Sequence, residues 1–217
     1  MIRALLIFLA ALCLTACAGR PLAEGERALA EDLFGPSLDV QKVRVKSGFR
    51  GAPKTDTAPP LPENPEPIKI RPGICDRTAP TPPEGPPPGW ALYNNVHFSK
   101  DYYRNDTAPG WPNQILLPQT FIMAHELVHV WQWQNRKRTG YRPAKAALEA
   151  ILNQDPYFYV PEEGAGLLEY GFEQQASLLE DYLCYAIFDP KNARRGQIRA
   201  ILAPHFQMDR LDEALAR

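Results

Sequence analysis

The chain has 217 residues, of which 24 are basic and 25 acidic, so its formal net charge at pH 7 is −1. The basic residues form no stripe or patch along the sequence, and we therefore expect no nucleic-acid partner. The length suits one domain, or one domain with an extended arm.

The first residues have the pattern of a bacterial signal peptide. Arg3 gives a positive start, and the apolar run Ala4–Leu14 is too short to cross a bilayer, which takes about 20 residues. The run ends in Leu14-Thr15-Ala16-Cys17, which resembles the lipoprotein signal and implies cleavage after residue 16 and lipidation of Cys17. Because Ala18 follows instead of aspartate, the resemblance implies an outer-membrane anchor facing the periplasm. The alternative is an ordinary signal peptide with a coincidental cysteine.

Residues 17–50 are predicted to begin the folded domain with a helix and a strand. The apolar residues of Glu24–Phe34 have helical spacing, and Gly35-Pro36 ends the segment. Val40–Val45 alternates in a way that is typical of a strand.

Residues 51–89 are rich in proline and hold 13 of the chain's 23 prolines. Proline lacks the amide donor that a helix interior or a central strand needs. We therefore expect either an insertion that follows an irregular path across the surface or a partly extended linker. The segment can rim a cleft, or it can be disordered and held only locally by Ile68, Ile70 and Cys75. Cys75 lies in this segment, and the sequence leaves open whether it pairs with Cys184.

Residues 90–217 are predicted to form the core of the domain together with its C-terminal helices. Alternating apolar and aromatic residues from Trp90 to Phe98 indicate a strand or hairpin. The expected class is α+β, with a small sheet packed on helices. Helices are predicted over Pro118–Arg138, Pro143–Leu152, Phe172–Phe188, Gln197–Leu202 and Gln207–Leu215.

The first of these helices contains His125-Glu126-Leu127-Val128-His129, an H-E-x-x-H pattern. Histidines four residues apart are rotated by about 40° around a helix, so both rings can reach one ion. Zinc suits imidazole ligands and lowers the pKa of bound water to about 7. Glu126 projects about 100° further round the helix, where it can accept a proton from that water. The alternative is a core helix with two hydrogen-bonded histidines, although burying all three polar side chains without partners is costly.

A tetrahedral zinc held by two histidines and one water needs a third protein ligand. Extended metzincin motifs would place a histidine at position 135, which is Asn135, so that class is excluded. His97 and His205 each lie beside an aromatic residue, and ordinary hydrogen-bonded or surface roles are expected for them. A carboxylate from the helix after Phe172 is the natural donor, because Glu173 and Glu180 lie on nearly one face of it.

Among the downstream carboxylates, the flanking residues favour Glu173 as the ligand. Gly171 and Ala176 bracket it with small side chains, which would let the two helices approach closely, whereas bulky Tyr182 follows Glu180. The other candidates are Glu163, Glu169 and Glu180.

Two motifs together, H-E-L-x-H-V-W-Q at 125–132 and Y-G-F-E-Q-Q-A at 170–176, carry a family resemblance. The chain resembles the gluzincin-type, zincin-like peptidases of bacteria, a group related to the metallopeptidase-like domains of contractile-injection and polymorphic-toxin proteins. The segments at 25–30 and 43–45 also resemble that group's N-terminal part. The resemblance covers most of residues 24–185, with the proline-rich segment as an insertion.

The resemblance implies a zincin-like fold with His125, His129 and Glu173 as zinc ligands and Glu126 as the catalytic base. Position 177 departs from the pattern, because some members carry there an aspartate that orients a ligand histidine, whereas this chain has serine. Two carboxylates close by can take that role, Glu180 and Asp181.

We therefore predict a zinc-dependent peptidase that acts on a protein or peptide and is held in the bacterial envelope by its N-terminal lipid. The alternative is a non-catalytic envelope lipoprotein, in which zinc holds two helices together and the proline-rich arm binds a partner. A third possibility is a toxin or effector passenger, which a lipoprotein signal disfavours. Candidate donors to the reacting carbonyl oxygen are Tyr157, Tyr159, Tyr170 and Tyr182.

Overall fold

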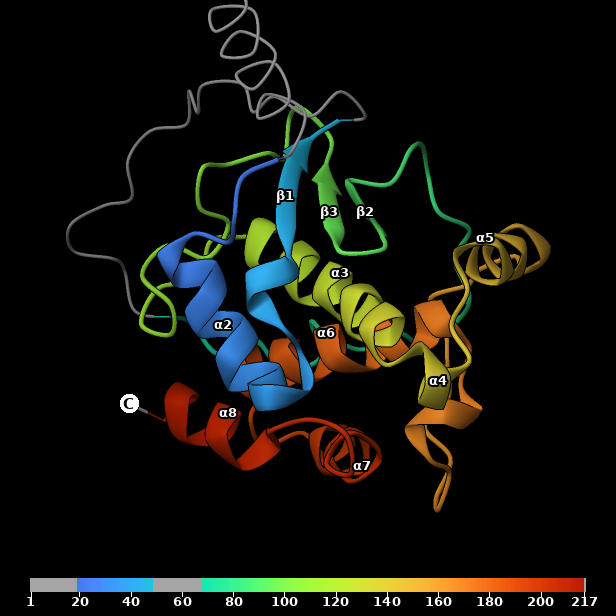
Figure 1. Ribbon diagram of the computed structural model, residues 1–217. Coiled ribbons are helices and arrows are strands. Elements are labelled where there is room, and N and C mark those ends of the chain that lie inside the picture. The colour runs from blue at the N-terminus through green and yellow to red at the C-terminus, as the bar shows by residue number, and fades with distance from the viewer. Residues whose placement is uncertain (1–18, 49–67, 217) are drawn as a thin grey trace, which may run out of the picture.

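The computed structural model describes residues 19–48 and 68–216, in which a small sheet packs against helices (Figure 1). The predicted signal peptide and Cys17 lie outside this part of the chain. The predicted α+β class is confirmed. Among the described residues, no helix has the length and apolar character needed to cross a membrane.

The sheet has three strands, β1 (Arg44–Ser47), β2 (Gly89–Leu92) and β3 (Asn95–Phe98), arranged in the order β1-β3-β2. β2 and β3 form the antiparallel hairpin that the alternating residues predict. β1 pairs in parallel with β3, which brings residues far apart in the sequence side by side. β2 is consequently an edge strand of the described sheet.

The described chain also contains seven α-helices. Three of them begin and end where apolar spacing and the following glycine or proline predict, namely α2, α5 and α6. The helices are α2 (Glu24–Phe34), α3 (Gln119–Gln134), α4 (Arg136–Thr139), α5 (Pro143–Leu152), α6 (Phe172–Phe188), α7 (Ala193–Leu202) and α8 (Met208–Leu215).

The strand predicted over Val40–Val45 is wrong in its first half. Val40–Lys42 forms a short 3-10 helix, and the strand begins only at Arg44. The Asp39 side chain accepts a hydrogen bond from the amide of Gln41, and the Asp39 carbonyl accepts one from the amide of Lys42. These local bonds favour a turn where the apolar alternation alone indicates an extended backbone.

The helix predicted over Pro118–Arg138 is interrupted near its end. α3 stops at Gln134, and α4 follows after Asn135. The Asn135 side chain donates to the carbonyls of Ser37 and Trp131, which ties the break to the loop after α2. Such a contact is not visible in local sequence. α7 also starts earlier than predicted, at Ala193 instead of Gln197.

Helix α3 forms the middle of the molecule, between the sheet on one side and α6 on the other (Figure 1). Twelve of its 16 residues are buried, in agreement with its apolar character on all sides. α2 packs against α3 and α8, and α7 packs against α6. The two histidines of the H-E-x-x-H pattern therefore lie inside the fold, facing α6.

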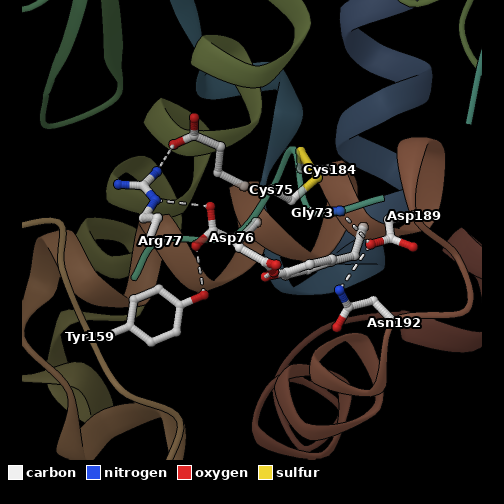
Figure 2. Close-up of a disulfide and its surroundings, with 11 residues drawn as sticks. Gly73, Cys75, Asp76, Arg77, Tyr159, Cys184, Asp189 and Asn192 are labelled. Carbon is white, nitrogen blue, oxygen red and sulfur yellow. Dashed lines mark hydrogen bonds and ion pairs between the residues drawn. A yellow bond between two sulfur atoms is a disulfide. The ribbon is translucent and has the colours of Figure 1, made fainter. Parts of the chain in front are cut away.

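Residues 68–88, the described part of the proline-rich segment, contain no helix or strand. They are nevertheless attached to α6 by a disulfide between Cys75 and Cys184, whose Cα atoms are 5.8 Å apart (Figure 2). The pairing that the sequence leaves open is thus formed. It fixes an irregular segment against a helix that lies 109 residues away in the sequence.

Candidate metal centre

Helices α3 and α6 bring the three predicted ligands together. The Oε2 atom of Glu173 lies 3.2 Å from Nε2 of His125 and 3.1 Å from Nε2 of His129. One ligand atom from each residue lies within 4.8 Å of the others, so the group can hold a metal ion. Two imidazoles and one carboxylate are the protein ligands of many catalytic zinc sites. The residues therefore fit a zinc ion.

The second nitrogen of each histidine ring also has a partner. Nδ1 of His125 lies 3.1 Å from Oε2 of Glu180, and Nδ1 of His129 lies 2.9 Å from Oε1 of Gln132. Carboxylate and amide oxygens only accept hydrogen bonds, so both Nδ1 atoms carry protons. Each Nε2 atom is thereby left as the metal-facing nitrogen. This arrangement orients the rings as metal-ligating histidines require.

Gln132 is a site residue that sequence analysis missed. Its amide nitrogen donates to the carbonyl of Phe172 and to Oε1 of Gln175, while its oxygen accepts from His129. The side chain is fully buried. It therefore fixes the ring of His129 and joins α3 to the first turn of α6, where Glu173 lies. The sequence offers no signal for this role beyond the position of a glutamine three residues after His129.

The charges of the site shift the pKa values of its members. Burial alone would lower the pKa of His125, but its hydrogen bonds to Glu173 and Glu180 outweigh burial and raise that pKa to about 10. Burial would raise the pKa of Glu173, but the two histidines hold it well below its usual range. The site thus favours a cation on the Nε2 side of both rings, where a metal ion competes with protons.

Glu126 is buried beside the ligands without belonging to them. Among the described residues, its Oε2 atom has no hydrogen-bond partner. Burial raises the pKa of Glu126 to about 7, with the histidines opposing the shift and the other carboxylates adding to it. A buried carboxylate with a pKa near neutrality and an unpartnered oxygen is suited to accepting and returning a proton.

A cavity of about 300 Å³ opens onto His125 and Glu126. Residues 83–88 of the proline-rich segment also line it. The remaining lining residues are Arg77, Gly89, Ile122, Tyr157 and Glu180. The segment therefore borders a cleft, which was one of the two possibilities that its composition left open. Because β2 begins at Gly89, the edge of the sheet also borders this cleft.

Of the four tyrosines considered as donors, Tyr157 alone lines this cavity. Its ring centroid is 5.7 Å from that of His125. Tyr159 donates its hydroxyl proton to Asp181, and Tyr182 donates to Asp212. The Tyr170 hydroxyl accepts a hydrogen bond from the amide of Glu162.

A further tyrosine near the ligands, Tyr141, was not predicted. Its ring centroid lies 6.2 Å from that of His129, and burial together with the charges of Glu173 and Glu126 raises its pKa.

The remaining histidines take no part in the ligand group. His97 donates from Nδ1 to the carbonyl of Gly48, and His205 packs against Trp131.

The other carboxylate candidates have different contacts. Glu180 binds the outer nitrogen of His125, which places it beside a ligand instead of among the ligand atoms. Glu169 accepts a hydrogen bond from the amide of Gly166. Glu163 is exposed and is not part of the ligand group.

Comparison with known proteins identifies a relative among bacterial secretion proteins. No family model matches the chain. The chain is 26% identical over 165 residues to the type VI secretion system spike protein VgrG2b of Pseudomonas aeruginosa, a match that covers 76% of this chain and 13% of that protein. It also matches the solved effector domain of P. aeruginosa VgrG2b with a TM-score of 0.51 and 25% identity, covering 88% of this chain and 85% of that domain. The chain is therefore homologous to the effector domain of a type VI secretion spike protein.

Proposed function

We propose that the chain is a zinc-dependent peptidase. The observation that carries the proposal is the convergence of His125, His129 and Glu173 beside a buried carboxylate, Glu126, that has an oxygen without a partner in the described residues. When bound, zinc would polarise a carbonyl and lower the pKa of water. A site that only stabilises the fold needs no such base and usually fills all four positions with protein ligands.

The residues around the site have separable roles in hydrolysis. Glu126 takes a proton from the attacking water and delivers it to the leaving amine as the peptide C–N bond breaks. Tyr157, on the cavity wall, can donate a hydrogen bond to the carbonyl oxygen as negative charge develops there. Gln132 and Glu180 keep the two histidine rings in the required orientation.

The substrate is proposed to be a protein or peptide in an extended conformation. β2 is the edge strand of the described sheet, and it starts at Gly89 on the border of the cavity. A Cβ atom built on Gly89 would lie 3.3 Å from Oε1 of Glu126, so the strand passes directly beside the base. An extended chain that adds to this edge would bring one of its peptide bonds to Glu126.

We further propose that the peptidase is anchored in the bacterial envelope through lipid on Cys17, with its catalytic part in the periplasm. The support is the lipoprotein-like sequence Leu14-Thr15-Ala16-Cys17. A second candidate function is suggested by the homology to an effector domain, namely that the chain is itself an effector of a type VI secretion system. The two differ in how the protein reaches its substrate, and the chemistry proposed for the site is the same in both.

The test is a digest of an unbiased peptide library by zinc-loaded wild type and by Glu126→Gln. We expect the variant to keep its zinc and to lose activity by several orders of magnitude, because the substitution removes only the base. Glu213→Gln, an exposed glutamate on α8, serves as the matched control and should cleave like wild type. A wild type that binds zinc and cleaves nothing would favour the non-catalytic lipoprotein, and equal cleavage by Glu126→Gln would refute the role of Glu126.

A further inference from the structure

Residues 71–77 of the proline-rich segment run along the C-terminal half of α6 and are attached to it repeatedly (Figure 2). The first two attachments are to residues 188 and 189, and the last is to residues 180 and 181, which lie nearer the metal centre. They are the amide of Arg71 to the carbonyl of Phe188, the amide of Gly73 to Asp189, the Cys75–Cys184 disulfide, Asp76 to the Tyr185 hydroxyl, and Arg77 to Asp181 and Glu180.

The last attachment reaches a residue that contacts a predicted ligand. A terminal nitrogen of Arg77 lies 3.7 Å from Oε2 of Glu180, and the same oxygen lies 3.1 Å from Nδ1 of His125. Nε of Arg77 is 3.1 Å from Oδ1 of Asp181. The guanidinium group thus connects the proline-rich segment to His125 through one intervening carboxylate.

The contact between Arg77 and Glu180 joins opposite charges. Glu180 lies in a site that already contains the carboxylates of Glu126 and Glu173, so a further negative charge there is repelled unless a cation balances it. His125 contacts the Glu180 carboxylate directly, and Arg77 adds a second positive charge that helps to keep this carboxylate in contact with His125. Arginine suits the role because its planar group can contact two neighbouring carboxylates at once.

Arg77 is itself held from two directions. Asp181 accepts hydrogen bonds from Arg77 on Oδ1 and from the Tyr159 hydroxyl on Oδ2. Two residues before Arg77, the disulfide joins Cys75 to Cys184 on α6. The described part of the segment has no helix or strand of its own, so the position of Arg77 depends on such contacts and on the covalent bond.

We propose that Arg77 is a positioning residue of the metal centre and that the Cys75–Cys184 disulfide holds it in place. The contact from Arg77 to Glu180 fixes the proton-bearing side of His125, so zinc affinity depends on a segment that contributes no ligand. It follows that the protein with its disulfide formed binds zinc more tightly than the protein without it. The inference rests on the proposed zinc site but does not require that the protein cleave peptides.

The test measures zinc affinity against a competing chelator for wild type, Arg77→Ala and the double variant Cys75→Ser/Cys184→Ser. Serine variants are used because thiol reductants bind zinc themselves. Both should lose affinity by about 3–10-fold, less than the roughly 10–100-fold typical of removing a direct partner of a ligand. Arg195→Ala is the matched control, since Arg195 is similarly exposed and pairs with Asp212 on α8. It should bind zinc like wild type.

A double-mutant cycle distinguishes positioning from a general effect on the fold. If Arg77 acts through Glu180, Arg77→Ala should cost little further affinity once Glu180→Ala is present. In the metal-free protein, the proton on Nδ1 of His125 should give a slowly exchanging low-field NMR signal in wild type that is weakened in Arg77→Ala. Thermal unfolding checks that each variant is folded.

Wild-type zinc affinity and an unchanged His125 signal in Arg77→Ala would overturn the inference, as would losses that simply add in the cycle. Failure of the proposed function looks different. A wild type that binds zinc but cleaves no peptide refutes the peptidase and leaves the role of Arg77 to be decided by affinity alone. A protein that cleaves peptides with Arg77→Ala as tight as wild type refutes the inference and leaves the peptidase standing.

Discussion

At the residue scale, the two ring nitrogens of each predicted ligand histidine have different partners. Nδ1 of His125 and His129 faces a fixed acceptor, and Nε2 of both faces Glu173. Two glutamates on the same face of α6 therefore have different roles. Glu173 belongs with the ligand atoms, and Glu180 belongs with the groups that hold a ligand in place.

The first prediction compares those two glutamates. Glu173→Ala should weaken zinc binding far more than Glu180→Ala, because the former removes a ligand and the latter only a partner of one. For Glu180→Ala the expected loss is about 10–100-fold. Competition with a chelator measures both. If Glu173→Ala holds zinc like wild type and Glu180→Ala does not, the ligand lies two turns further along α6.

The second prediction concerns protons and zinc. His125 has its pKa raised from 6.5 to about 10 in the folded protein, so at neutral pH the metal-free ring is protonated. Zinc must displace that proton, so its apparent affinity should rise with pH up to about 10. Calorimetry at pH 7.5 in buffers of different ionisation enthalpy should report proton release. Heats that are independent of the buffer would contradict the assignment.

The same shift has the opposite sign for the stability of the metal-free fold. A histidine with a raised pKa stabilises the folded state fully below the unfolded value of 6.5, and this contribution is lost as pH rises through about 10. Saturating zinc should remove this dependence, because the bound ring no longer takes up the proton. Denaturant unfolding across this pH range, with and without zinc, measures both effects.

At the element scale, the close approach of β2 to α3 determines where Glu126 lies. A Cβ atom on Gly89 would come within 2.7 Å of Cγ2 of Ile122 and 3.3 Å of Cγ of Glu126. The backbone of Gly89 does not lie in the left-handed region. A larger residue is therefore disfavoured at this position by lack of space for its side chain, and not by the backbone conformation. Glycine is needed at this position because a strand and a helix meet there over the base.

The third prediction follows from that contact. Gly89→Ala should displace Ile122 or Glu126, lower the stability by about 1–3 kcal/mol and reduce peptidase activity by about 10–100-fold. Zinc binding should persist, because the atoms nearest to the added Cβ belong to Ile122 and Glu126 and not to a predicted ligand. Gly196→Ala on α7 is the control, since a Cβ atom there meets nothing within 4 Å. Unchanged activity in Gly89→Ala would show that the strand does not constrain the base.

The elements also show which structural features can be predicted from sequence. α2, α5 and α6 follow from apolar spacing and from glycine or proline stops, which are local signals. The H-E-x-x-H pattern places two ligands and a base on one helix by the same local geometry. The turn at Val40–Lys42 and the break at Asn135 arise from side-chain hydrogen bonds. The spacing of apolar residues contains no information about these bonds, so it does not predict either feature.

At the scale of the whole molecule, the cleft is built from segments that lie far apart in the sequence. Residues of α3 and residues 83–88 both line it, and residues 71–77 of the same proline-rich segment are held against α6 by a disulfide and several side-chain contacts. Composition indicates only that this segment is irregular. Its place beside the site depends on contacts such as Arg77 with Asp181, which join residues 104 apart and leave no periodic signal in the sequence.

The whole molecule also carries the prediction about anchoring, which concerns residues outside the described part of the chain. Lipid on Cys17 would place several acyl chains at the N-terminus, enough to hold a folded domain at a membrane surface, where one chain binds only weakly. Expressed at full length in a Gram-negative host, wild type should enter the detergent phase and carry a lipid mass on its N-terminal peptide. Cys17→Ser should lose both.

Cys13→Ser is the matched control, because Cys13 lies within the apolar run and precedes the cleavage point. It should be processed and lipidated like wild type. Zinc affinity should be the same in all three proteins, since neither substitution changes a predicted ligand. A Cys17→Ser protein with the same mass and partitioning as wild type would contradict the anchor. That outcome would remove the main argument against a secreted effector, while the chemistry proposed for His125, Glu126, His129 and Glu173 would still be decided by Glu126→Gln.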